Sequence, residues 1–151
     1  MNADRKRLIR LRRLEKIRAI AKQTAALEAA QAESTLSQLK SLSERTRALA
    51  ADYASRREMA DGAALYQVGR FVSGLQAISQ TTEGDAQRAQ SIADAKQLQL
   101  AAAERRRAAI EERATLQERM IAKAGETPAL SARRSSGSGS DADPGSGTGL
   151  E

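Results

Sequence analysis

The chain lacks several residue types on which chemistry usually depends. It contains no cysteine, no histidine and no tryptophan, and aromatic residues make up only 2% of its 151 residues. Disulfides, thiolate nucleophiles, imidazole bases and the usual zinc ligands are therefore excluded. The acidic side chains lie in arginine-rich segments, where solvated charge pairs explain them. We expect no enzyme, no cofactor, no metal site and no small-molecule substrate.

Long hydrophobic runs are also missing. No apolar segment approaches the roughly 18 residues that cross a bilayer as a helix. The N-terminus lacks the apolar core and the cleavage site of a secretory signal. We therefore expect a soluble cytoplasmic protein.

What is present indicates long helices. Apolar residues at helical spacing run from about Asp4 to Ala124, with no proline before Pro128. Asp61-Gly62 is the clearest turn signal and lies near the midpoint of this run. The sequence thus predicts an all-α fold, a long antiparallel two-helix coiled-coil hairpin over residues 1–124, with arms at about 4–60 and 63–124. The alternative is an extended parallel dimer of continuous helices, which leaves Gly62 in a helix interior.

Each arm carries an apolar pattern that predicts the seam between the helices. In the first arm Leu14, Ile17, Ile20 and Leu27 recur 22 residues later as Leu36, Leu39, Leu42 and Leu49, a spacing that favours a nearly straight seam. The second arm offers Phe71, Leu75, Ile78, Thr82, Ala89, Ile92, Lys96, Leu100, Ala103, Arg107, Ile110, Ala114 and Ile121. Pairing about the turn sets Leu49 near Leu75 and Leu14 near Ile110.

The second helix is expected to end near Ala124. Gly125 can adopt a left-handed cap and Pro128 opposes resumption of the helix. The remainder, residues 125–151, is rich in serine and glycine and lacks apolar periodicity. Such a segment is predicted to be disordered.

The net charge of +6 is concentrated at the start of the chain. The stretch R-K-R-L-I-R-L-R-R-L-E-K-I-R, from Arg5 to Arg18, is its main source. This stretch suits nucleic acid, an anionic membrane or an acidic protein surface, or is simply the solvated face of a helix. Charge alone leaves these interpretations open, and we favour a protein partner.

All three aromatic side chains lie near the predicted turn. They are Tyr53, Tyr66 and Phe71, with Leu75 and Ile78 beside them. A two-helix hairpin has no third layer to cover its outer faces, so these residues either close the hairpin or form a docking surface for a partner.

A family resemblance covers about residues 4–124. The second helix begins with a Tyr-x4-Phe-x3-Leu-x2-Ile ladder (Tyr66, Phe71, Leu75, Ile78), preceded by a basic first helix and followed by the segment E-R-R-R-A-A-I-E-E-R-A-T-L-Q-E-R. In this pattern and in its length the chain resembles the FliJ family of flagellar export proteins.

The resemblance implies a role in bacterial flagellum assembly by type III secretion. Members of the family are two-helix stalks that stimulate the hexameric export ATPase, link it to the cytoplasmic domain of the membrane export gate, and escort export chaperones. It implies a cytoplasmic location, peripherally associated with the inner membrane at the flagellar base through these partners. The remaining alternatives are a generic coiled-coil scaffold, a virulence-type secretion stalk and a basic-helix protein that binds nucleic acid, the last being disfavoured.

Two sets of residues carry these implied roles. The face that contacts the gate matches Phe71, Leu75, Ile78, Thr82, Leu42, Leu49 and Tyr53. The end that enters the ATPase ring matches Arg5, Arg7, Arg10, Arg12, Arg13, Arg18, Arg106 and Arg113.

Overall fold

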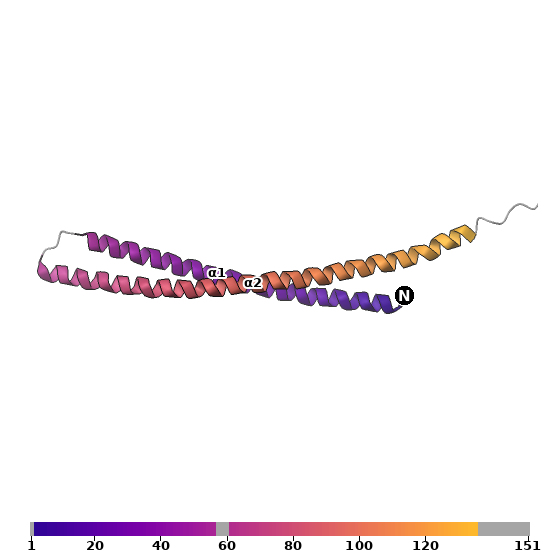
Figure 1. Ribbon diagram of the computed structural model, residues 1–151, viewed down its shortest axis with the longest axis horizontal. Coiled ribbons are helices and arrows are strands. Elements are labelled where there is room, and N and C mark those ends of the chain that lie inside the picture. Colours follow the sequence, from indigo (N-terminus) through magenta and orange to yellow (C-terminus); the bar gives the residue numbers. More distant parts are fainter. Residues whose placement is uncertain (1, 57–60, 136–151) are drawn as a thin grey trace, which may run out of the picture. The chain divides into compact units, whose positions relative to one another are not determined.

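The computed structural model of the protein describes residues 2–56 and 61–135 and consists of two long helices. These are α1 (Asn2–Ser55) and α2 (Gly62–Ser135), as Figure 1 shows. The two helices pack against each other in antiparallel directions, which confirms the predicted all-α hairpin. The chain divides into two units, one formed by residues 15–109 and the other by residues 1–14 and 110–151.

The seam of the unit formed by residues 15–109 is made of small side chains. In α2 the buried residues alternate in steps of three and four, and they are Ser79, Thr82, Ala86, Ala89 and Ala93. In α1 the buried residues fall at intervals of seven, with one intermediate position, and they are Ala29, Leu36, Ser43, Thr46 and Ala50. This is the heptad spacing of a coiled coil, so the 22-residue seam predicted for the first arm is wrong.

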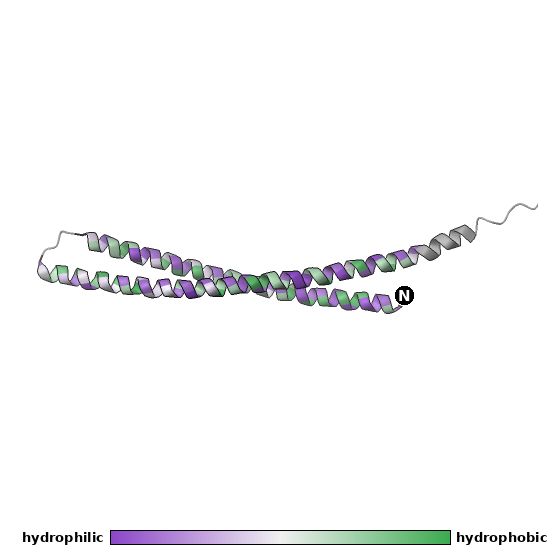
Figure 2. Ribbon diagram, viewed as in Figure 1, coloured by the Kyte–Doolittle hydropathy of each residue, from purple (hydrophilic) through white to green (hydrophobic). Residues whose placement is uncertain are grey.

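Most of the large apolar residues predicted for the first seam face solvent instead. Only Leu36 and Leu39 lie at the interface, where they pack with Ala89 and Ala93. The exposed ones are Leu14, Ile17, Ile20, Leu27, Leu42 and Leu49. Figure 2 shows hydrophobic residues distributed along both helices between hydrophilic ones. The face of α1 that packs against α2 is the one rich in alanine and serine. The residues of the 22-residue recurrence therefore do not all lie on the packed face of α1.

The second-arm pattern is largely confirmed. Its seam positions that are buried or half-buried are Leu75, Thr82, Ala89, Lys96, Leu100, Ala103, Arg107, Ile110, Ala114 and Ile121. Phe71, Ile78 and Ile92 are exposed, and the prediction is wrong for these three. Each of them immediately precedes a smaller residue that faces α1 instead, as Ile78 precedes Ser79 and Ile92 precedes Ala93.

Two buried threonines show how polar side chains fit into this seam. The Thr46 hydroxyl donates to the Leu42 carbonyl at 2.8 Å, and the Thr82 hydroxyl donates to the Ile78 carbonyl at 2.7 Å. Because each hydroxyl is satisfied within its own helix, its burial costs little free energy. Small seam residues bring the helices close together but bury little apolar area, so the seam contributes modest stability per residue.

A row of polar pairs fixes the register of α1 against α2. Lys40 Nζ donates to Gln90 at 3.1 Å, and Arg47 pairs with Glu83 at 3.1 Å. Gln97 donates to Glu33 one heptad further along. When the residue number on α1 rises by seven, the residue number of its partner on α2 therefore falls by seven. We call the side of the hairpin formed by these six residues the polar edge.

The first helix ends earlier than the predicted arm. Its last residue is Ser55 rather than a residue near 60, and the Ser55 hydroxyl donates to the Asp52 carbonyl at 2.8 Å. Arg56 also pairs with Asp52 at 3.1 Å. The Ser55 hydroxyl contact offers the backbone an alternative to continued helix, whereas the Arg56–Asp52 pair has the i, i+4 spacing of an ordinary helical ion pair. Leu65 and Tyr66 in the first turns of α2 are exposed.

Asp61 starts the second helix. Its carboxylate accepts the Ala64 N–H at 2.8 Å, and its carbonyl accepts the Leu65 N–H at 3.2 Å. This is the N-cap arrangement, in which a side chain replaces a helical partner that the first turn lacks. The predicted turn signal at Asp61-Gly62 therefore marks a helix start, with Gly62 as the first residue of α2.

In the other unit the same two helices are joined by charged and polar contacts. Arg12 pairs with Glu118, with guanidinium nitrogens 2.6 and 3.1 Å from one carboxylate oxygen. Gln117 donates to Asp4 at 3.2 Å beside the fully buried Ala114. Asp4 thus lies within α1 and contacts α2. Ile110 is half-buried in the seam, whereas Leu14, which the sequence set near it, is 42% exposed.

The C-terminal end of α2 departs from the prediction. The helix continues past Ala124 and through Pro128 to Ser135, so the predicted end and the start of the disordered tail at residue 125 are wrong. Gly125 has no left-handed backbone conformation and therefore does not form the expected cap. Alanine and leucine after Pro128 favour helix, which offsets the one backbone hydrogen bond that proline removes. The rest of the predicted tail, residues 136–151, lies outside the described residues.

Candidate docking edge

The residues expected to dock a partner divide into two groups in the structure. Thr82 is buried in the seam, and Leu75 and Tyr53 are half-buried beside it. The others remain open to solvent, with exposed fractions of 50% for Leu42, 42% for Leu49, 46% for Phe71 and 52% for Ile78. The first group supports the hairpin, and the second is available to another molecule.

The four exposed residues lie on one side of the hairpin. Leu42 and Leu49 each precede a buried seam residue of α1, namely Ser43 and Ala50. On α2, Phe71 and Ile78 stand in the same relation to Val72 and Ser79. In an antiparallel coiled coil the positions just before such seam residues face the same side on both helices. The polar-edge residues follow the seam residues by four and lie on the opposite side.

Ile92 extends this side of the hairpin, although the sequence placed it in the seam. It precedes the buried Ala93 and is 55% exposed. We call the surface formed by Leu42, Leu49, Phe71, Ile78 and Ile92 the apolar edge. The residues of the apolar edge are recognised by their position immediately before a seam residue. This position can be assigned only once the seam is known to consist of small residues such as alanine and serine.

An aromatic contact closes the end of the apolar edge next to the loop. The rings of Tyr53 and Phe71 meet edge to face, with centroids 4.9 Å apart and planes at 74°. The Arg56 guanidinium lies 4.2 Å from the centroid of the Tyr53 ring. Both geometries are favourable for aromatic rings. Tyr53 therefore fixes the position of Phe71 while nearly half of the Phe71 side chain stays accessible.

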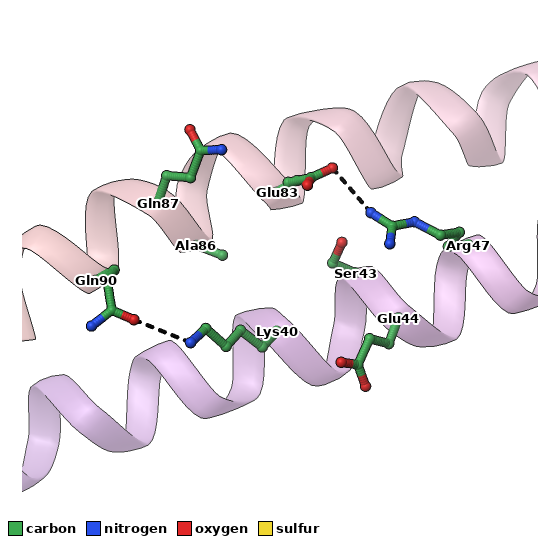
Figure 3. A pocket seen from close by; sticks show the side chains of 8 residues that line it. All are labelled: Lys40, Ser43, Glu44, Arg47, Glu83, Ala86, Gln87 and Gln90. Carbon is green, nitrogen blue, oxygen red and sulfur yellow. Dashed lines mark hydrogen bonds and ion pairs between the residues drawn. The ribbon is translucent and has the colours of Figure 1, made fainter.

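The polar edge contains a groove of about 370 Å³. Figure 3 shows its lining, with Lys40 reaching Gln90 and Arg47 reaching Glu83 across it. The groove forms because the seam residues at its floor, Ser43 and Ala86, are too small to fill the space between the helices. Two of its charged groups, Arg47 and Glu83, pair with each other across the hairpin, and Lys40 donates to the uncharged amide of Gln90.

Among residues 2–56 and 61–126 no group of three or more acidic side chains could hold a metal ion. In the part of the chain that the structure covers, neither helix has a stretch apolar enough to cross a bilayer.

The arginines expected at the ATPase end are mostly solvent-exposed. In the unit formed by residues 1–14 and 110–151 the exposed ones are Arg5, Arg7, Arg10, Arg13 and Arg113, whereas Arg12 is half-buried in its ion pair with Glu118. In the unit formed by residues 15–109, Arg18 and Arg106 are exposed. Arg107 differs from its neighbour Arg106 because it lies at the seam, where its Nε is buried without a hydrogen-bond partner.

Comparison of the chain with protein-family models, curated proteins and solved structures gives no match.

Proposed function

We propose that this protein is a stalk and adaptor of a flagellar type III export apparatus and not an enzyme. In this role the hairpin stimulates the export ATPase through the stretch from Arg5 to Arg18, which we call the basic segment. It binds the cytoplasmic domain of the export gate through its apolar edge and escorts export chaperones. It acts in the cytoplasm, associated with the inner membrane at the flagellar base through these partners.

The observation that carries the proposal is that the chain exposes two chemically different surfaces, one apolar and one cationic. The apolar edge lies between residues 42 and 92, in the unit formed by residues 15–109, and exposes large side chains over a seam of alanine and serine. The stretch from Arg5 to Arg18 instead exposes five arginines, which are Arg5, Arg7, Arg10, Arg13 and Arg18. A protein that links two partners needs two chemically different surfaces, and apolar and cationic surfaces select different partners.

The fold supports a mechanical rather than a chemical role. Helices of 54 and 74 residues extend on the order of 80 and 110 Å at 1.5 Å per residue. Backbone hydrogen bonds within each helix, together with the polar pairs between them, resist bending.

The experiment is a bridging assay with the full chain. The cytoplasmic domain of the export gate is immobilised, and capture of the export ATPase is measured with and without this protein. We expect capture to require the protein, to be lost with Ile78→Glu through loss of gate binding, and to be lost with Arg10→Gln/Arg13→Gln through loss of ATPase binding. Absence of binding to both partners by the folded wild-type protein would refute the proposal.

A further inference from the structure

The apolar edge repeats in heptads on both helices. Leu42 and Leu49 are seven residues apart on α1, as are Phe71 and Ile78 on α2, and Ile92 lies two further heptads along. Side chains at these positions would contact a third helix that lies in the groove between two antiparallel helices. The third helix would also cover the seam between them. We propose that the apolar edge receives one amphipathic helix from a partner protein and thereby completes a three-helix coiled coil.

The two sides of the hairpin differ in whether they can accept such a helix. On the polar edge, Lys40–Gln90 and Arg47–Glu83 connect α1 and α2 over the seam at 3.1 Å each. A helix on that side must break these pairs and desolvate their charges. At the same positions along the hairpin, the apolar edge presents Leu42, Leu49 and Ile78. Covering these apolar side chains removes them from water at no cost in broken ion pairs. One added helix is therefore the expected number.

The dimensions of the apolar edge favour a helix over a second copy of this chain. Phe71 and Ile92 lie three heptads apart, which is about 30 Å of helix. Each of the five side chains is close to half exposed, and at roughly 200 Å² for a side chain of this size the edge offers on the order of 500 Å² of apolar surface. A stable interface between two folded proteins needs about 800 Å² from each partner. A single helix with a three-heptad apolar stripe matches this smaller area.

Charge at the rim defines the chemistry of the partner helix further. Arg45 lies between Leu42 and Leu49 on the outer side of α1, is exposed, and pairs with no carboxylate in the described chain. An acidic residue flanking the apolar stripe of the partner helix would pair with it. Asp85 interrupts the apolar row between Ile78 and Ile92 and is held by Arg88. The partner therefore carries a polar residue opposite Asp85 instead of an apolar one.

This inference rests on the docking role given to the apolar edge under the proposed function, but not on the identity of the partner. The test accordingly uses a synthetic probe. The probe is a labelled three-heptad peptide with leucine at the two seam positions of each heptad, except for one asparagine opposite Asp85. It carries glutamate at the flanking positions, where like charges oppose its self-association. Binding to the full chain is measured by fluorescence anisotropy at physiological salt, and helix formation is followed by circular dichroism.

Two matched pairs of variants locate the binding face. Ile78→Glu and Leu98→Glu each place a carboxylate at an exposed aliphatic position of α2, and only Ile78 lies on the apolar edge. Leu49→Glu and Leu27→Glu form the corresponding pair on α1. We expect the edge variants to weaken peptide binding by at least about tenfold, and the two controls to stay within about twofold of wild type. Circular dichroism establishes that each variant remains helical.

Several outcomes overturn the inference. The peptide fails to bind the wild-type chain, or it binds edge and control variants equally, or sedimentation shows a wild-type dimer that Ile78→Glu converts to a monomer, in which case a second copy covers the edge. Binding of the gate domain is measured in parallel. If the peptide binds the edge and the gate domain does not bind the chain at all, the proposed function fails and the inference stands. If the gate domain binds the wild-type chain and loses binding with Ile78→Glu, while the peptide does not bind, the inference fails and the proposed function stands.

Discussion

The rings of Tyr53 and Phe71 are in edge-to-face contact at 4.9 Å, and they join the last turn of α1 to the early part of α2. Tyr53 is half-buried and Phe71 is exposed to 46%. The contact therefore supports the hairpin from one side while presenting an aromatic ring on the apolar edge.

The first prediction concerns this contact. Tyr53→Ala removes both the ring pair and a half-buried side chain, and should lower the free energy of unfolding by about 2 kcal/mol. Tyr66→Ala, which removes an equal side chain that is 68% exposed, should change it by less than about 0.5 kcal/mol. Chemical denaturation followed by circular dichroism measures both. Equal losses for the two tyrosines would show that the contact contributes nothing.

A second prediction distinguishes the seam in the structure from the seam expected from the sequence. Leu36 is 9% exposed and Leu27 is 61% exposed, although the 22-residue recurrence placed both in the seam. Leu36→Ala should lower the free energy of unfolding by about 2 to 3 kcal/mol, because it removes buried methyl groups. Leu27→Ala should cost less than about 0.5 kcal/mol. Denaturation midpoints in urea decide the matter, and a larger loss at Leu27 would mean that another face of α1 packs on α2.

A third prediction follows from the cap at Asp61. Asp61→Ala leaves the Ala64 N–H without its side-chain acceptor and should cost about 1 kcal/mol. Asp61→Ser restores an acceptor and should recover most of this loss. The thermal midpoint of unfolding is the readout. If Ala and Ser at this position give the same midpoint, the carboxylate does not cap α2.

The fourth prediction concerns Gly125, where sequence and structure disagree. A left-handed cap would make Gly125→Ala destabilising, whereas an ordinary helical position with free space around the Cα makes it stabilising. Because nothing lies within 4 Å of the position that the added methyl would occupy, we expect a gain of about 0.5 to 1 kcal/mol. An increase in helical circular dichroism and in the midpoint of unfolding checks this expectation. A lower midpoint would indicate that Gly125 forms a left-handed cap and that the helix ends near Ala124, as the sequence predicted.

The sequence predicted the fold and part of the candidate site for identifiable reasons. The absence of proline before Pro128 and the turn signal at Asp61-Gly62 are local properties, and they were sufficient to predict two long helices and their antiparallel pairing. The same register that sets Leu49 near Leu75 also sets Tyr53 near Phe71, and those rings are in contact.

The errors arose where two helical faces compete for the same partner. Ile78 and Ser79 are adjacent, so either can face α1 after a rotation of α2 by one residue position. Hydrophobicity favours Ile78, whereas the structure buries Ser79 and brings the helices closer together. Which of the two residues is buried depends on how both helices fit together along their length. The periodicity of one helix in the sequence carries no information about that fit. The apolar edge is the consequence of this choice.

ATP turnover is the decisive assay for our proposal that this hairpin is a stalk that activates an export ATPase. Turnover by the flagellar export ATPase is measured alone, with the wild-type protein, with Arg10→Gln/Arg13→Gln, and with Arg70→Gln/Arg88→Gln as a control that removes equal charge outside the basic segment. We expect stimulation by the wild-type protein and by the control, and loss of most of it with Arg10→Gln/Arg13→Gln. If the folded wild-type protein gives no stimulation in a preparation where the ATPase assembles rings, the hairpin is not an activating stalk.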